Sequence, residues 1–274
     1  MERSEGASVI VSTYNDPARL MFVLEGLSRQ VVRPLDVHVA DDGSRDETRE
    51  LCEAWKERLP FPLHHHWHPD RGKRKGTIAN HAVVESVGTE LLFLDGDSIP
   101  HSRWISDHLE CAGRGQVRCG RRVKLGPRIT ERVMSGDIQP KELESPFGPT
   151  FRSAVAGDTL RFGLSVRLPR PLVKILHPKP RRLMGVNFSV SRTAFEAVNG
   201  YDMNWSGRRE DRELEIRLQM VGATFVPLIN RAVVYHLFHP EGTPTAATQA
   251  RLSELKSRGQ AFASNGLDQL IPQT

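Results

Sequence analysis

The sequence feature that most constrains the fold is an uninterrupted apolar run at residues 91–94, which ends at Asp95 and Asp97. A short apolar run bounded by turn residues is typical of a strand buried on both faces of a parallel sheet. Open α/β sheets bind ligands beyond the carboxyl ends of such strands. An acidic turn would also explain Asp-Gly-Asp, since both residue types are common in turns. Two carboxylates at this spacing suit Mg²⁺ or Mn²⁺ holding substrate phosphates.

Strands and helices alternate along the first hundred residues. Two further runs of strand length, residues 8–14 and 35–40, are each followed by apolar residues at helical spacing. Polar residues stand where these two runs end, namely Thr13, Tyr14, Asp41 and Asp42. Such alternation specifies a parallel sheet with right-handed crossovers. We therefore expect an α/β fold, a Rossmann-like and mostly parallel sheet flanked by helices in a single domain.

Basic residues are unevenly placed. Arg and Lys crowd into residues 71–75, 114–132 and 161–182, although the net charge of the chain is only +5. This indicates an anionic partner, either phosphate, a lipid surface or nucleic acid. Residues 70–76 form a glycine-bracketed basic loop before a predicted helix and could present cations to a phosphate, the alternative being a solvated charge run. No aromatic-studded basic face indicates nucleic acid, so we do not expect it as a partner.

Between residues 113 and 182 the periodic pattern degrades, and we expect an irregular basic insert there. Its second part, residues 161–182, mixes apolar residues with cations and prolines. Such a segment could lie on an anionic membrane surface, although its prolines disfavour one long amphipathic helix. A mobile loop over the active site or an acceptor-binding flap is the alternative.

Several classes of protein are disfavoured. No apolar run approaches the roughly 20 residues of a membrane span, and the N-terminus does not read as a secretory signal. Three cysteines without metal-site spacing indicate reduced thiols, as in the cytosol. The glycine patterns of P-loop hydrolases and dinucleotide dehydrogenases do not follow the first strand. We therefore expect a cytoplasmic protein.

Five short motifs occur in a fixed order. They are Ser-Thr-Tyr-Asn from position 12, Asp-Asp-Gly-Ser from 41, Asp-Gly-Asp from 95, Val-Asn-Gly-Tyr-Asp from 198 and Glu-Asp from 210. As a set they resemble the family 2 glycosyltransferases of the GT-A fold. Residues 94–101, 185–189 with 198–202, and 234–240 are particularly similar to the chondroitin-polymerase-like group, whose second half is similar to the β-1,4-galactosyltransferases. The resemblance covers residues 6–112 and 183–240.

The resemblance implies a binding site for a nucleoside-diphosphate sugar. Thr13 and Tyr14, with Asp41 or Asp42, would hold the base and ribose, most often of uridine. Arg74 matches a basic position of the phosphate-side loop. Asp95 would lie against both the ribose and a divalent metal ion, Mn²⁺ or Mg²⁺. The implied metal ligands are Asp95, Asp97 and His236, with His239 as runner-up to His236.

The resemblance also implies the reaction. Asp211 would be the general base that deprotonates an acceptor hydroxyl, and Glu210 would position the acceptor or the donor sugar. A single displacement from the opposite face inverts the anomeric carbon, so the expected enzyme is a metal-dependent, inverting, hexosyltransferase-like glycosyltransferase. Its acceptor would be a saccharide or lipid-linked saccharide of cell-envelope polysaccharide, lipopolysaccharide or capsule. Peripheral contact with the inner face of the cytoplasmic membrane is a further option.

Two departures from the family pattern leave the donor and acceptor open. Residues 206–209 read Ser-Gly-Arg-Arg, where the family usually has Gly-Trp-Gly and one more residue. Residues 79–80 read Ala-Asn, where the family commonly has Arg-Asn. A nucleotidyltransferase and a non-catalytic protein that binds sugar nucleotides or polyanions are the alternative functions.

We divide the chain accordingly into four segments. Residues 1–112 form the expected nucleotide-sugar-binding half, 113–182 the basic insert or acceptor flap, 183–240 the acceptor and catalytic half, and 241–274 a C-terminal helix and tail.

Overall fold

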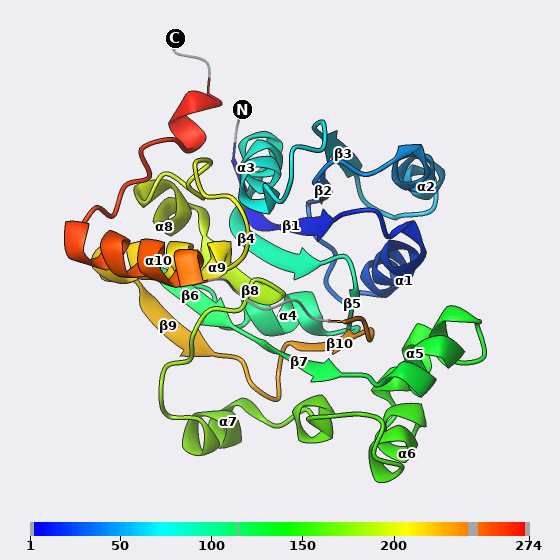
Figure 1. Cartoon of the computed structure of the whole chain (residues 1–274). Helices are drawn as coiled ribbons and strands as arrows, with labels where there is room; N and C mark the ends of the chain where they lie inside the picture. Colours follow the sequence, from blue (N-terminus) through cyan, green and yellow to red (C-terminus); the bar gives the residue numbers. More distant parts are fainter. Residues whose placement is uncertain (1–2, 114, 241–245, 272–274) are drawn as a thin grey trace.

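The computed structural model describes residues 3–113, 115–240 and 246–271 (Figure 1). Seven strands form its main sheet in the order β3-β2-β1-β4-β8-β6-β9. The first four are parallel neighbours, whereas β8 runs antiparallel to both β4 and β6. The strands are β1 (Ser4–Thr13), β2 (Asp36–Asp41), β3 (Leu63–Trp67), β4 (Gly88–Asp95), β6 (Gln116–Cys119), β8 (Asn187–Ser191) and β9 (Thr224–Pro227). The predicted α/β fold with a mostly parallel sheet is confirmed.

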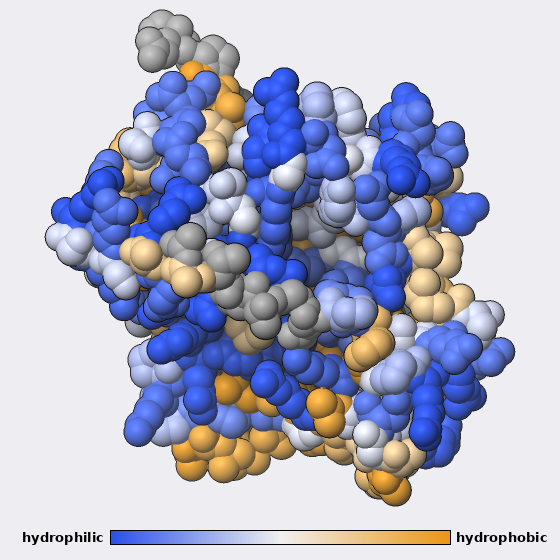
Figure 2. All heavy atoms as spheres, in the orientation of Figure 1, coloured by the Kyte–Doolittle hydropathy of each residue, from blue (hydrophilic) through white to orange (hydrophobic). Residues whose placement is uncertain are grey.

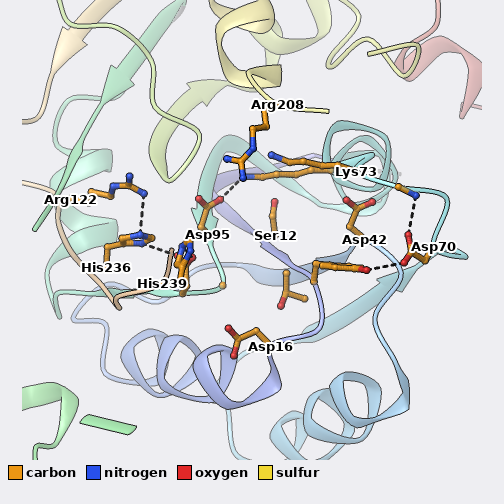
Figure 3. A pocket seen from close by; sticks show the side chains of 16 residues that line it. Ser12, Asp16, Asp42, Asp70, Lys73, Asp95, Arg122, Arg208, His236 and His239 are labelled. Carbon is orange, nitrogen blue, oxygen red and sulfur yellow. Dashed lines mark hydrogen bonds and ion pairs between the residues drawn. The ribbon is translucent and has the colours of Figure 1, made fainter. Parts of the chain in front are cut away.

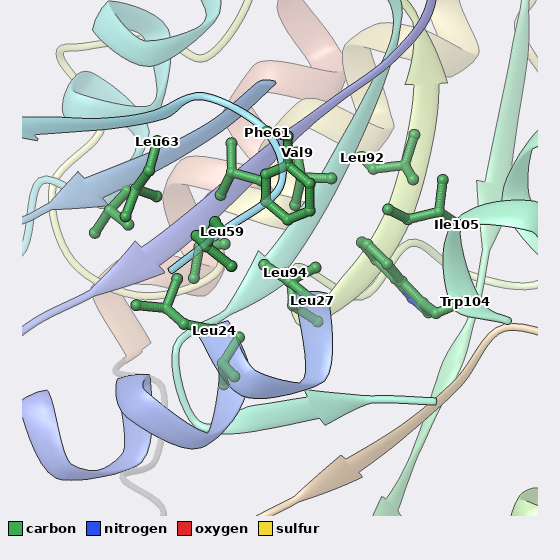
Figure 4. Packing of buried hydrophobic residues seen from close by; sticks show 14 of the residues in the cluster. Val9, Leu24, Leu27, Leu59, Phe61, Leu63, Leu92, Leu94, Trp104 and Ile105 are labelled. Atoms are coloured by element: carbon green, nitrogen blue, oxygen red, sulfur yellow. The ribbon is translucent and has the colours of Figure 1, made fainter. Parts of the chain in front are cut away.

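Helices cover both faces of this sheet. On one face pack α1 (Pro17–Ser28), α2 (Asp46–Lys56) and α4 (Trp104–Leu109), and on the other α3 (Lys75–Glu85), α8 (Arg192–Ala197) and α9 (Glu210–Met220). Because successive strand residues face opposite ways, Val9 joins the first layer and Ile10 the second. Figure 4 shows Val9 and Leu92 of the sheet among Leu24, Leu27 and Trp104.

The register of the central strands aligns their polar ends. Thr13 of β1 pairs with Asp41 of β2, and Ser12 pairs with Asp95 of β4. All three strands run parallel, so their carboxyl ends meet at one edge of the sheet. The polar residues that the sequence places after these strands therefore converge.

A second sheet brings the far end of the chain to that edge. It consists of β5 (Ser98–Pro100), β10 (Val233–His236) and β7 (Arg121–Lys124), with β10 in the middle. β10 is antiparallel to β5, and His236 pairs with Ser98. Asp97 immediately precedes β5, so this pairing places His236 beside it.

The segment expected to be irregular contains regular elements. β6 and β7 belong to the two sheets, and the helices α5 (Pro127–Met134), η1 (Pro140–Glu144), α6 (Pro149–Val155), η2 (Phe162–Ser165) and α7 (Arg170–Leu176) follow. Three of these helices begin at a proline, which is well suited to the first helical position. Arg118 makes β6 hard to recognise as a strand in the sequence, because this charged residue is buried and forms an ion pair with Glu90.

The chain ends in α10 (Ala246–Arg258) and η3 (Leu267–Gln269), and α10 packs against α9. Parts of three of the four segments lie outside the described residues. These are residues 1–2 of the first segment, residue 114 of the second, and residues 241–245 and 272–274 of the last.

The cysteines agree with the expected reduced state. All three, Cys52, Cys111 and Cys119, are free thiols. Burial raises the pKa of Cys52 and of Cys119 to about 12, so both remain protonated and unreactive. None of the described helices combines the length and the apolar character needed to cross a bilayer.

Candidate active site

A cavity of about 680 Å³ opens at the carboxyl edge of the main sheet. The ends of β1 and β4, the basic loop and the end of β10 contribute to its wall. Figure 3 shows His236, His239 and Arg122 at one end, Asp42 and Asp70 at the other, and Asp95 between them. Parallel α/β sheets place their ligands at this edge.

The Asp42 end has the groups that the sequence assigns to the base and ribose. Thr13, Tyr14 and Asp42 all line the cavity, and the Tyr14 hydroxyl donates to Asp70 at 2.8 Å. His68 lies 2.8 Å from an Asp42 oxygen, and the Arg74 backbone N–H donates to the same carboxylate. Burial raises the pKa of Asp42 despite these contacts.

Asp41 has a different place. It is fully buried and accepts a hydrogen bond from the Ser44 backbone N–H at 2.8 Å, while its second oxygen lies 2.9 Å from Nε2 of His65. These contacts hold the turn after β2. Of the two aspartates expected at the base and ribose, only Asp42 reaches the cavity.

The basic loop contributes lysines rather than the predicted arginine. Lys73 and Lys75 line the cavity, whereas the Arg74 guanidinium turns back and donates to the Pro69 carbonyl at 3.0 Å. The positive φ of Gly72, +80°, lets the loop turn here and so helps to decide which side chains face inward. Arg208 lines the cavity as well, so its cations come from more than one loop.

Asp97, His236 and His239 form a cluster at the other end. The two imidazoles each lie 3.0 Å from a different Asp97 oxygen. The candidate ligand atoms of all three residues lie within 4.8 Å of one another. Burial acts to raise the pKa of Asp97, but the two histidines outweigh it and hold this pKa below its usual range.

The groups around this cluster position it. The Ser98 hydroxyl donates to Asp97 at 2.9 Å, and Arg122 lies 3.2 Å from Nε2 of His236. His236 thus faces Asp97 through Nδ1 and Arg122 through Nε2, so contacts on both sides fix the orientation of its ring.

A carboxylate with two imidazoles fits a divalent cation. Mn²⁺ accepts such a mixed set more readily than Mg²⁺, which prefers oxygen. His239, the runner-up in the sequence, joins Asp97 and His236 here. Asp95, which was expected to share the ion, instead forms an ion pair with Lys75, and the cluster found among the described residues does not include it.

Glu210 and Asp211 begin α9, close to the two lysines of the basic loop. Glu210 lies 3.3 Å from the Lys73 ammonium. The Gly185 backbone N–H donates to Asp211 at 3.1 Å. A side chain at Gly185 would stand 3.4 Å from Asp211 and 3.6 Å from the Lys75 nitrogen, so these groups surround one small space.

The electrostatics around Asp211 favour a base. Burial and the neighbouring Glu210 raise the pKa of this carboxyl, while Lys75 and two backbone N–H groups lower it. Burial acts to lower the pKa of Lys75, but Asp95, Glu210 and Asp211 raise it. Lys75 therefore stays charged between the cavity and the α9 carboxylates.

The sequence reasoning missed several lining residues, including Asp16, Asp70, Arg122 and Arg208. Arg122 lies on a strand that the pattern did not reveal. Arg208 lies in residues 206–209, which depart from the family pattern, at the position where that pattern has a glycine. Trp205 does not replace the family's aromatic residue, because it is buried between α9 and α10 with Arg251 over its ring.

Comparison with known proteins finds relatives in sequence and in structure. The family model described as glycosyl transferase family 2 matches residues 8–160. Validoxylamine A glucosyltransferase of Streptomyces hygroscopicus subsp. limoneus is 28% identical over 224 residues, which are 78% of this chain and 48% of that protein. Glycosyltransferase AglE of Haloferax volcanii is 28% identical over 212 residues, 74% of this chain and 61% of that protein. The chain thus spans about half to three-fifths of the length of these relatives.

Solved structures share the fold. S. aureus TarS 1–349 in complex with UDP has a TM-score of 0.58 at 18% identity, covering 96% of this chain and 68% of that one. The mannosyltransferase PcManGT of Pyrobaculum calidifontis, in complex with GDP-Man and Mn²⁺, has a TM-score of 0.56 at 17% identity, covering 86% and 58%. The expected GT-A fold is confirmed, while the chondroitin-polymerase-like subgroup stays a prediction. Because the family model matches more than half of its residues, the chain belongs to glycosyl transferase family 2.

Proposed function

We propose that the protein transfers a sugar from a nucleoside-diphosphate sugar to a hydroxyl of a saccharide or lipid-linked saccharide, with inversion at the anomeric carbon. One observation carries this proposal. A candidate metal cluster and a carboxylate suited to be a base flank the same row of polar strand ends, with Lys75 between them. The geometry matches a reaction that must hold a diphosphate at one side and activate a hydroxyl at the other.

The donor side is argued from the cavity. Thr13, Tyr14 and Asp42 offer hydrogen-bonding groups for a base and ribose, and Lys73, Lys75 and Arg208 offer cations for phosphates. We favour a UDP-sugar. UDP is bound in the structure of TarS, whose match covers 96% of the chain described here. The GDP-Man bound to PcManGT makes a guanosine donor the comparison to test.

Asp97, His236 and His239 would hold the metal ion, which when bound neutralises charge on the leaving diphosphate. Lys75 and Arg208 add fixed positive charge to the same cavity. Such preorganised charge stabilises a leaving group without reorganisation during the reaction.

Asp211 would take the proton of the acceptor hydroxyl. A general base works best when its pKa approaches the working pH, and burial with Glu210 shifts the pKa of Asp211 in that direction. Since one displacement needs one base and no protein nucleophile, inversion follows. The apolar and basic character of residues 146–182 supports an acceptor of the cell envelope.

Calorimetric titration of UDP and GDP, with Mn²⁺ and then with a chelator, tests the donor and the metal together. We expect heat with UDP that needs Mn²⁺ and disappears with the chelator. If neither nucleotide gives metal-dependent heat, the transferase proposal is wrong. A non-catalytic binder would bind UDP but release none from UDP-sugars, and a nucleotidyltransferase would turn over nucleoside triphosphates instead.

The effect of Lys75 on Asp211 predicts a pH shift. Lys75→Met removes a charge that lowers the pKa of Asp211, so this pKa should rise further. The base acts only when deprotonated, and kcat falls as the pH falls through its pKa. The acid limb of the kcat profile should therefore move to higher pH in the variant.

Lys73→Met is the matched control for this prediction. Lys73 belongs to the same loop but pairs with Glu210 rather than with Asp95. We expect its acid limb to move less than that of Lys75→Met. An unchanged limb in Lys75→Met, at measurable activity, would show that Asp211 does not set it.

A further inference from the structure

Positive charge is concentrated in residues 146–182, which is one of the basic segments of the chain. Residues 146–182 contain eight Lys and Arg residues and one acidic residue. The remainder of the chain has 30 basic and 32 acidic residues, so it is slightly acidic. This segment, which we call the basic segment, therefore carries a local excess of positive charge.

Most of its cations are free to bind a partner. Seven are exposed, namely Arg152, Arg161, Arg170, Lys174, Lys179, Arg181 and Arg182. Within the described parts of the chain, none of the seven has a carboxylate at ion-pair distance. Arg167 is the exception, since its guanidinium pairs with the buried Asp107 at 2.5 Å and anchors the segment to the fold.

The same segment exposes large apolar side chains. Helix α7 turns Leu172, Ile175 and Leu176 to solvent, with Ile175 73% exposed, and only Val173 of this helix is buried. Spacings of three and four residues put the three exposed side chains on one stripe. Phe147, Val155, Leu160 and Val166 are exposed as well, so seven of the sixteen exposed large apolar residues in the described chain belong to this segment.

These features share one side of the molecule. In Figure 1, α7 and α6 lie at the two ends of the lower edge, below the second sheet and away from the chain ends. Figure 2 shows hydrophobic residues gathered along this lower edge, over α6 and α7, beside strongly hydrophilic ones. The face therefore combines cations with an unpartnered apolar stripe.

We propose that the basic segment is a docking surface for an anionic lipid bilayer. Unpaired cations are attracted to anionic headgroups, and an exposed apolar stripe beside them is stabilised by entering the acyl boundary. A polyanion dissolved in water would use the cations but would leave the stripe of α7 exposed. A bilayer, with anionic headgroups and an apolar interior, uses both.

Docking would place the active site next to the bilayer. Leu160 of the basic segment lines a second cavity, of about 500 Å³, whose wall includes His236 and His239 of the metal cluster. An acceptor anchored in the bilayer would thus approach the end of the active site at which the metal cluster lies. This consequence rests on the proposed function, whereas the docking itself does not.

Vesicle flotation of the full chain without nucleotide tests the docking. The vesicles contain phosphatidylcholine alone or equal parts of phosphatidylcholine and phosphatidylglycerol. We expect the protein to float with the anionic vesicles only, and to be released by salt, which screens the headgroups. Ile175→Asn with Leu176→Asn, and separately Arg170→Gln with Lys174→Gln, should each lower the partition coefficient about tenfold.

The matched control is Val221→Asn with Lys256→Gln, which removes an exposed apolar residue and an exposed cation from the α9–α10 edge. It should bind as the unchanged protein does. UDP binding measured by calorimetry shows that each variant is folded. If the protein floats with anionic vesicles but does not bind UDP, the donor proposal is wrong and the docking proposal stands. Equal binding to neutral vesicles, undiminished flotation of the α7 variant, or retention by RNA without flotation would each overturn the docking proposal.

Discussion

Replacing Asp211 with Asn is expected to lower kcat by about 10²–10⁴-fold, the usual contribution of a general base. The amide has nearly the same shape and can still accept the Gly185 N–H, so the start of α9 should keep its structure. UDP release from a UDP-sugar in the presence of acceptor, followed at steady state, measures the effect.

The binding of UDP with Mn²⁺ should stay unchanged in Asp211→Asn, because Asp211 is not among the described residues that line the cavity. Asp137→Asn, an exposed aspartate between α5 and η1, is the matched control and should retain full kcat. A kcat within a few-fold of the unchanged protein would remove Asp211 from the mechanism.

The second large effect concerns the metal cluster. His236→Ala should weaken Mn²⁺-dependent UDP binding by about 100-fold or more, since losing even a group that only orients a metal ligand costs about 10–100-fold. His236 is nearly buried, so thermal unfolding without metal must accompany the titration. Asp97→Asn gives a second test with little change in volume.

Two further histidines sharpen this result. His239→Ala should have an effect of similar size if His239 is a third ligand, as its position 3.0 Å from Asp97 indicates. His177→Ala is the control, because this imidazole lies beside Asn230, away from the cluster. Unaltered metal dependence in both His236→Ala and Asp97→Asn would show that the ion binds elsewhere.

The strands and the site edge were largely accessible from the sequence because they rest on local patterns. The apolar run before Asp95 and the acidic start of α9 at Glu210 and Asp211 both lie where the pattern placed them. Periodicity and capping residues act within a few positions, so a linear reading detects them.

Side-chain direction in loops was not accessible in the same way. The family resemblance predicts Arg74 at the phosphates, but Lys73 and Lys75 line the cavity, and the loop turns at Gly72. Similarly, Asp95 lies against Lys75, a contact that depends on how α3 and β4 pack. The direction of these side chains depends on tertiary packing, which the spacing of residues along the chain does not reveal.

Short strands rich in charged residues are also difficult to predict from the sequence. β7 is four residues long and contributes Arg122 to the cavity, yet its composition resembles a solvated loop. It becomes a strand because β10 pairs with it in parallel. Long-range pairing of this kind overrides local preference.

The pairing of β10 with β5 joins Asp97 to His236 across 139 positions of the chain. On a ribosome, the aspartate emerges long before its imidazole partner. In the proposed function the metal cluster is needed for transfer, so a nascent chain that ends before β10 is expected to be inactive. Activity would then require synthesis of the last strand of the second sheet.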